Sequence, residues 1–180
     1  LRRPLKIQAP GKVFVLGMIQ TAAFLLLQTL ALISGGAGRT AILIYTMPVW
    51  TLMLGWLLLG EKLRGSQWLA ALSALFGLTL IVAPWQIDAS PLSQGAAVAA
   101  ALCWALGTML MKRWRTALGN DLIGITAWQL LLGAIPLWLA TLGVAEPATR
   151  WGADYFAILA FMAVVSTALG WFLWFYVLGH

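Results

Sequence analysis

Charged residues are so sparse in this chain, and so spaced, that they leave six uncharged stretches, each long enough to cross a lipid bilayer. About 20 apolar residues in a helix match a hydrocarbon core of about 30 Å. Only 9% of the residues are charged, against about 25% in soluble domains, so a solvated surface cannot be built. The pattern predicts an all-α polytopic membrane protein. The stretches are Val13 to Gly38, Thr40 to Gly60, Gly65 to Ile87, Ala89 to Met111, Leu122 to Ala145 and Tyr155 to His180.

Lysines and arginines indicate which side of the membrane each loop faces. Nine of them lie in the N-terminal segment and in two later loops on the same side, and the opposite side holds only Arg39 and Arg150. Because basic loops stay in the cytoplasm, we expect the N-terminal segment to be cytoplasmic. The predicted spans, alternating in direction and starting outward, are Val13 to about Ile33, Ala41 to Gly60, Trp68 to Val82, Ala96 to Met111, Leu122 to Leu142 and Tyr155 to Leu178.

The first and sixth spans resemble each other at an offset of 146 residues. QTAAFLLLQTLAL, starting at Gln20, aligns with STALGWFLWFYVL, starting at Ser166, and Thr21 falls on Thr167. The similarity is weak on its own in so apolar a chain. Five spans separate equivalent points, and because five is odd, equivalent helices cross in opposite directions. This favours an inverted-topology repeat of the kind that transporters use.

Residues for catalysis are missing from the spans. All five acids lie outside them, and a single histidine excludes the HExxH zinc pair. Neither a G-x-S-x-G nucleophile motif nor a P-loop is present. We therefore predict no enzymatic activity, no catalytic residue, no metal site and no cofactor. The net charge of +6 is explained by the cytoplasmic loops, so no nucleic-acid partner is expected.

Neutral polar side chains inside the spans are the first candidates for a binding site. Gln20 and Thr21 share a face of the first span with Gln28 and Thr29, at seven- and eight-residue spacing. An amide in lipid is costly unless it is hydrogen-bonded or faces water. One interpretation is a cavity wall that offers donors and acceptors to a small-molecule substrate. The other is hydrogen bonding between helices, worth only about 0.6 kcal/mol on average.

Hydroxyl, aromatic and amide groups in three other spans add further candidates for the same cavity wall. Tryptophans buried in a bundle more often pack with their N–H satisfied. A threonine in a helix often bonds back to its own backbone. Both alternatives stay open beside the cavity role. The candidates are Tyr45, Thr46, Trp104, Trp128 and Gln129.

Pro48 and Glu61 are candidates for moving parts. Pro48 lies in the interior of the second span, where a proline frees a backbone carbonyl and kinks the helix, so a hinge is predicted there. Glu61 follows the cytoplasmic end of the same span, beside Lys62 and Arg64. We predict a cytoplasmic gate or brace at Glu61. The alternative is a loop ion pair of little energetic value.

Three blocks of sequence resemble the EamA-like family of the drug/metabolite transporter superfamily. One joins Pro48-Val49 to the closing Leu59-Gly60-Glu61 and the small-residue helix that runs from Trp68 to Val82. GAAVAALCWALGTMLMKRW, from Gly95, resembles the first helix of the family's second repeat. TAWQLLLGAIPL, from Thr126, resembles the second helix of that repeat.

The resemblance implies a helical bundle built from an inverted five-plus-five helix repeat, of which this chain would supply helices three to eight, truncated at both ends. It implies that residues 1–12 are a cytoplasmic basic leader and 84–94 an external loop. It implies that residues 13–83 are the last three helices of the first repeat and 95–180 the first three of the second.

By the same resemblance, the protein would be a secondary transporter of the bacterial inner membrane, more often an exporter, of small organic metabolites or drugs. It would work by alternating access. The alternative is a non-transporting membrane assembly or scaffold protein, whose spans would pack tightly through small residues. The expected partners are the lipid bilayer and a small-molecule substrate, with a homodimer as a further candidate.

Overall fold

The computed structural model describes residues 7–62, 64–82, 90–143, 151–170 and 173. Over these residues the chain forms helices and turns, with no strand. Four helical stretches are long and apolar enough to cross a membrane, and the apolar helix Ala153–Leu169 is shorter. The prediction of a helical, multi-pass membrane protein is confirmed. The four stretches are Pro10–Ile33, Ala37–Leu59, Pro91–Arg113 and Leu122–Thr141.

The chain divides into two compact units, residues 1–139 and residues 140–180, and each is described by itself. Parts of the predicted leader (1–6), of the predicted external loop (84–89) and of the sixth span (171–172 and 174–178) lie outside the described residues. The third predicted span is the helix α5, Gly65–Val82, which packs against the two helical segments that precede it.

The first span is a helix with a π-helical segment in its middle. It consists of α1 (Pro10–Leu16), the π-helix η1 (Gly17–Ala23) and α2 (Phe24–Gly35). The sequence predicted a regular helix here. In a π-helix the backbone bonds run from residue i to i+5, a geometry that is rare and often found at functional sites. Gln20 and Thr21 both lie in η1.

The second span is interrupted by a short turn just before Pro48. α3 (Ala37–Ile44) ends at a two-residue turn, and α4 (Met47–Leu59) begins a new helix with Pro48 in its first turn. The interruption therefore lies at Tyr45 and Thr46, directly before the helical turn that contains Pro48, and a hinge at Pro48 stays a prediction. A proline in the first helical turn lacks an N–H that would have no partner there anyway, and its fixed φ suits a helix start.

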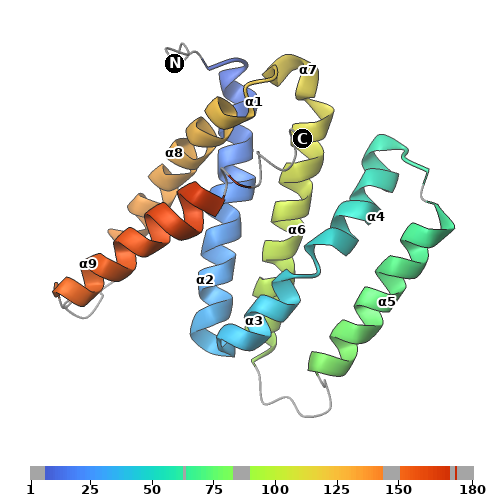
Figure 1. Ribbon diagram of the computed structural model, residues 1–180, viewed down its shortest axis with the longest axis horizontal. Coiled ribbons are helices and arrows are strands. Elements are labelled where there is room, and N and C mark those ends of the chain that lie inside the picture. Colours follow the sequence, from blue (N-terminus) through green and yellow to red (C-terminus); the bar gives the residue numbers. More distant parts are fainter. Residues whose placement is uncertain (1–6, 63, 83–89, 144–150, 171–172, 174–180) are drawn as a thin grey trace. The chain divides into compact units, whose positions relative to one another are not determined.

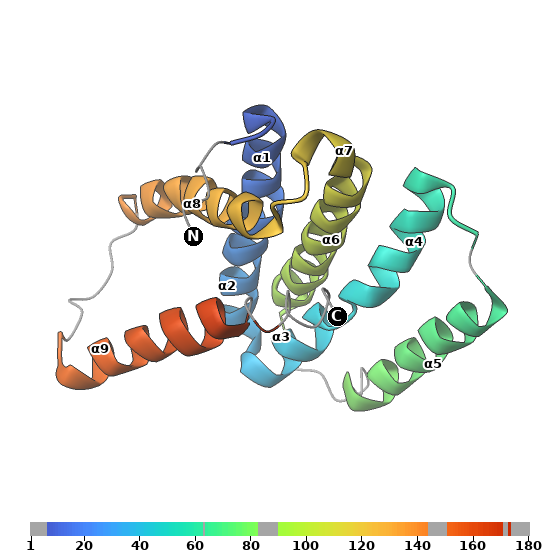
Figure 2. The ribbon, with the colours of Figure 1, turned by 45° about the horizontal axis from the view of Figure 1, so that its top comes forward.

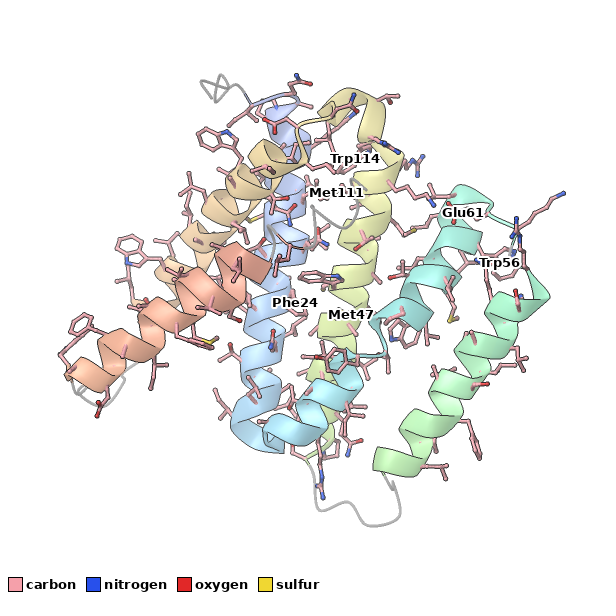
Figure 3. The ribbon with its side chains drawn as sticks, viewed as in Figure 1. Phe24, Met47, Trp56, Glu61, Met111 and Trp114 are labelled. Carbon is pink, nitrogen blue, oxygen red and sulfur yellow. The ribbon has the colours of Figure 1, made fainter. Side chains whose placement is uncertain are left out.

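The helix α6, Pro91–Arg113, is the element on which the first unit is built. It lies between α2 and α4 and packs against η1, α2, α3 and α4 (Figures 1 and 2). Its buried residues are mostly alanines, which let neighbouring helix backbones come close. Around them packs an apolar cluster in which Phe24 and Met47 reach α6 from different helices (Figure 3). The buried alanines are Ala96, Ala97, Ala100, Ala101 and Ala105.

After the short helix α7 (Arg115–Leu118), the helix α8 (Leu122–Thr141) packs against the first span. The two helices cross at a pair of glycines. A Cβ atom added at Gly133 would lie 2.6 Å from the carbonyl oxygen of Gly17 and would also collide with the side chain of Thr21. A Cβ at Gly17 would lie 2.9 Å from the carbonyl oxygen of Gln129. This close crossing brings the polar residues of η1 against α8.

The second unit contains the helix α9, Ala153–Ala160, and the π-helix η3, Phe161–Leu169. Its described residues are all exposed. The Thr167 hydroxyl donates to the carbonyl oxygen of Met162 at 2.9 Å, five residues back, which is the spacing of a π-turn. The sixth span therefore carries the same irregularity as the first.

Replacing Gly133 by alanine is expected to loosen the crossing of η1 and α8. The added methyl group has backbone on one side and the Cβ of Thr21 on the other, so neither can move aside cheaply. Such overpacking typically costs about 1–3 kcal/mol. The measurement is the thermal midpoint of the purified protein in detergent. Gly95→Ala is the matched control, because a Cβ at Gly95 meets nothing within 4 Å; equal midpoints for the two variants would contradict the crossing.

Candidate functional site

Three polar side chains from three different spans meet in one hydrogen-bonded row. The amide nitrogen of Gln129 on α8 donates to Gln20 Oε1 on η1 at 3.1 Å. The amide nitrogen of Gln20 donates to Thr108 Oγ1 on α6 at 3.2 Å. The Thr108 hydroxyl in turn donates to the carbonyl oxygen of Trp104 at 3.0 Å. Gln20, Thr108 and Gln129 are called the amide row below.

The amide row is buried inside the first unit. Gln20 is 6% exposed and Gln129 is 3% exposed. Next to them, Thr21 and Thr126 are buried to a similar degree. Two oxygens at this site, Thr21 Oγ1 and Gln129 Oε1, are buried without a hydrogen-bond partner in the described structure. Because most buried polar atoms in proteins have a partner, these two oxygens mark the site as one with unused hydrogen-bonding capacity.

Gly107 explains how Gln20 fits against α6. A Cβ atom at position 107 would lie 2.6 Å from the Cβ of Gln20 and 2.9 Å from its Cγ and Cδ. The side chain of Gln20 therefore occupies the space that a larger residue would fill. Thr108 follows directly in the sequence and supplies the hydroxyl that Gln20 reaches.

The two tryptophans among the predicted cavity residues flank the amide row without entering it. The Trp104 ring packs on Phe24, with the ring centroids 4.9 Å apart and the planes tilted by 60°. Trp128 is half-buried and packs against the apolar cluster of Val13, Leu16 and Ile125. The structure thus brings Gln20, Thr21 and Gln129 together.

The residues around Pro48 lie elsewhere. Tyr45 is 75% exposed at the break between α3 and α4. Thr46 is buried, donates its hydroxyl to the carbonyl oxygen of Leu43 at 2.6 Å and accepts a hydrogen bond from the Trp50 indole at 3.0 Å. The Thr46 side chain closes the end of α3, so its bonds stabilise the break itself. Thr51 likewise donates its hydroxyl to its own helix, to the carbonyl oxygen of Met47 at 2.8 Å.

Glu61, which follows α4 (Figure 3), forms an ion pair with Lys112 at the end of α6 and not with its sequence neighbours. The chain turns at Gly60, whose φ of +66° is left-handed, and the Gly60 and Glu61 amides donate to the carbonyls of Trp56 and Gly55. The carboxylate then folds back over Gly55, where an added Cβ would lie 3.1 Å from Glu61 Oε2. The pair joins the ends of α4 and α6.

Two residues of these contacts were not singled out in the sequence, namely Thr108 as the partner of Gln20 and Lys112 as the partner of Glu61. Both lie on one face of α6 with Trp104, at steps of four residues. That spacing was the available signal. Among the described residues there is no cluster of histidine, cysteine, aspartate and glutamate that could hold a metal ion.

The fold and the site together define an integral membrane protein whose spans enclose a buried polar row. The sequence model of the EamA-like transporter family matches residues 2–83 and again residues 93–180. The chain belongs to the EamA-like transporter family, as the resemblance predicted.

Two of the three curated relatives described next carry transporter or efflux-pump names. The chain is 29% identical over 148 residues to the uncharacterized transporter YoaV of Bacillus subtilis, covering 80% of this chain and 50% of that protein. It is 25% identical over 167 residues to the protein PecM of Dickeya dadantii, covering 91% and 55%. It is 28% identical over 158 residues to a probable amino-acid metabolite efflux pump of Escherichia coli, covering 80% and 51%.

The chain spans about half the length of these curated relatives. No solved structure matches it.

Replacing Gln20 by leucine is expected to lower the stability of the bundle. The change removes both hydrogen bonds of Gln20 and leaves the Gln129 amide without an acceptor, a loss of about 1–3 kcal/mol for a buried polar group. Thermal unfolding in detergent measures it. Gln28→Leu, in the same span and half-buried, is the control and should stay within about 0.5 kcal/mol of the parent protein. If both variants unfold alike, the amide row contributes nothing to packing.

Proposed function

We propose that the protein is a secondary transporter and not an enzyme, and that it exports small organic metabolites or drugs by alternating access. The observation that carries the proposal is the amide row, buried at the crossing of three spans in a member of a transporter family. Ionisable side chains are absent from the row, so recognition would rest on hydrogen bonds and aromatic contacts. The name of the Escherichia coli relative suggests amino-acid metabolites as the first compounds to test.

Two backbone irregularities support a substrate pathway near the amide row. η1 interrupts the first span at Gln20, and the break at Tyr45 and Thr46 interrupts the second. Transporters place broken helices at the bilayer midplane, where half-helix ends and unpaired backbone groups face the substrate. Phe24, Ile44 and Trp104 belong to one packed cluster, so the break and the π-helix both border α6.

An inverted repeat is part of the proposal. The family model matches the chain twice, and the offset of 146 residues places Ala23, where η1 ends, on Leu169, where η3 ends. Equivalent spans would then carry π-helices at equivalent places. We propose that the halves on either side of residues 84–94 rock about the site, in a bacterial inner membrane with the N-terminal segment cytoplasmic.

The second candidate function is that of a non-transporting assembly or scaffold subunit. The tight glycine crossing of Gly17 and Gly133 favours it, because close packing of small residues is what a structural bundle needs. It predicts that the interior around Gln20 never meets water, whereas a transporter must admit water to the site in part of its cycle.

Thiol labelling separates the two functions. Single cysteines are placed at Gln20, Thr21 and Gln129 in a Cys103→Ala background, which removes the one native cysteine. For a transporter we expect reaction with a membrane-impermeant maleimide, and slower reaction when substrate is present. Leu25 and Leu26, which are exposed on the first unit, are the controls; we expect them to face lipid and to stay unreactive. The full-length protein in proteoliposomes is tested in parallel with labelled amino acids; no uptake or exchange together with unreactive interior cysteines would leave the scaffold function.

The Glu61–Lys112 pair is proposed as a cytoplasmic gate, because it joins the end of α4 in the first half of the chain to the end of α6 in the second half. Both side chains are partly exposed, 38% for Glu61 and 54% for Lys112, so the pair should add no more than about 1 kcal/mol to stability. Glu61→Gln and Lys112→Gln are expected to change the transport rate with little change in the thermal midpoint. The charge-reversed double variant, Glu61→Lys with Lys112→Glu, should restore the rate. Lys62→Gln controls for the loss of one positive charge, and an equal effect there would exclude the gate.

A further inference from the structure

The hydrogen bonds of the amide row all run in one donor-to-acceptor direction, and that direction is set at the end where Thr108 meets the backbone carbonyl of Trp104. The carbonyl oxygen of Trp104 can accept a hydrogen bond but cannot donate one, so the Thr108 hydroxyl must be the donor in their contact. Its hydrogen is thereby used, and Thr108 Oγ1 is left to accept. The group of Gln20 that faces Thr108 is therefore the amide nitrogen. The oxygen of Gln20 faces the other way, towards α8.

The same reasoning fixes Gln129. Because Gln20 presents its oxygen to α8, Gln129 must present its amide nitrogen in return. The opposite order of the two amides would keep two hydrogen bonds but lose the bond between Thr108 and Trp104. The observed order keeps all three. Amide orientations are normally assigned from such networks, and here the network has one order that satisfies every contact between its members.

The row consequently ends in an acceptor. Gln129 Oε1 is the last atom of the row and is buried without a hydrogen-bond partner in the described structure. A buried amide oxygen without a donor costs about 1–3 kcal/mol. Thr21 Oγ1, on the neighbouring residue to Gln20, is a second buried oxygen without a partner. A group that binds at Gln129 Oε1 therefore has to donate a hydrogen bond to that oxygen.

We infer that Gln129 Oε1 binds a hydrogen-bond donor of the transported molecule, such as an ammonium, amide N–H or hydroxyl group, and discriminates against carboxylate, ester and ether oxygens at that point. The inference rests on the proposed function for its substrate, but the binding preference is a property of the row. Thr108 is then a positioning residue. Its hydroxyl touches no substrate and sets the orientation of both glutamines.

The role of Thr108 gives the inference a sharp test. In Thr108→Val the shape is kept but the hydroxyl is gone, so Gln20 faces an apolar side chain with either end of its amide. With either orientation of the two amides, the one hydrogen bond between Gln20 and Gln129 is kept. Both glutamine amides can therefore flip together at no cost in hydrogen bonds. The row would end in an oxygen or in an amide nitrogen about equally. The preference for a donor should therefore disappear, while a serine at position 108 should preserve it.

The experiment measures binding to the full-length protein in nanodiscs by calorimetry, with pairs of related probes in which one member can donate a hydrogen bond and the other cannot. Phenethyl alcohol can donate, and its methyl ether can only accept. Phenethylamine and phenylacetate form the charged pair. For the unmodified protein we expect the alcohol to bind at least about tenfold more tightly than the ether, because a site built around a hydrogen bond rejects an analogue that lacks it. The ratio should fall towards one in Thr108→Val and in Gln129→Leu, and should persist in Thr108→Ser.

Each outcome decides the matter. Equal binding of alcohol and ether by the unmodified protein, or binding of neither, overturns the inference, as does a ratio unchanged in Thr108→Val. Titrations in sodium chloride and choline chloride identify an ion: sodium binding that requires Gln129 and displaces the alcohol would assign the oxygen to a cation and overturn the donor proposal. A tenfold preference in binding without transport by proteoliposomes would overturn the proposed function alone. Transport without the preference would overturn this inference alone.

Discussion

The structure depends on the cost of burying polar side chains in apolar spans, which is lowered when they form hydrogen bonds with one another. Water is absent from the hydrocarbon core, so an amide that cannot find a partner costs several kcal/mol. Gln20 lowers this cost by contacting two other spans, Thr108 on α6 and Gln129 on α8. The glycines at positions 17, 107 and 133 follow from it, because the helices must come close enough for short side chains to reach one another. The bundle is built around its polar contacts as much as its apolar ones.

Much of the fold was available from the sequence, and the limits of that reading have physical causes. The spacing of charges located the four described membrane-length stretches to within about five residues, because hydrophobic length is fixed by the bilayer. The π-helix at Gln20 was not foreseen, since one extra residue in a turn leaves apolar periodicity almost unchanged. The break at Thr46 was read as a kink. Whether a proline bends a helix or starts a new one depends on local bonds, here those from Thr46 to Leu43.

The candidate site was predicted in part for a similar reason. Gln20 and Gln129 stood out as amides in apolar spans, and the structure brings them together. Their partner Thr108 did not stand out, because a threonine in a helix can bond to its own backbone, and this one does. Tyr45 was grouped with them and lies exposed at the helix break. How deep a span lies in the bundle, and which of its faces points inward, is set by packing against other helices. The sequence of a single helix does not reveal this packing.

Gln20 also has a mechanical meaning. Gln20 lies in the half of the chain before residues 84–94, and both of its partners lie in the half after them. Any rocking of the proposed kind therefore has to break its two hydrogen bonds. Interhelical bonds in membranes are worth about 0.6 kcal/mol each, so two of them bias an equilibrium by roughly tenfold. Gln20 would then act as a reversible latch, strong enough to favour the closed arrangement of the spans and weak enough to release it at ordinary temperature.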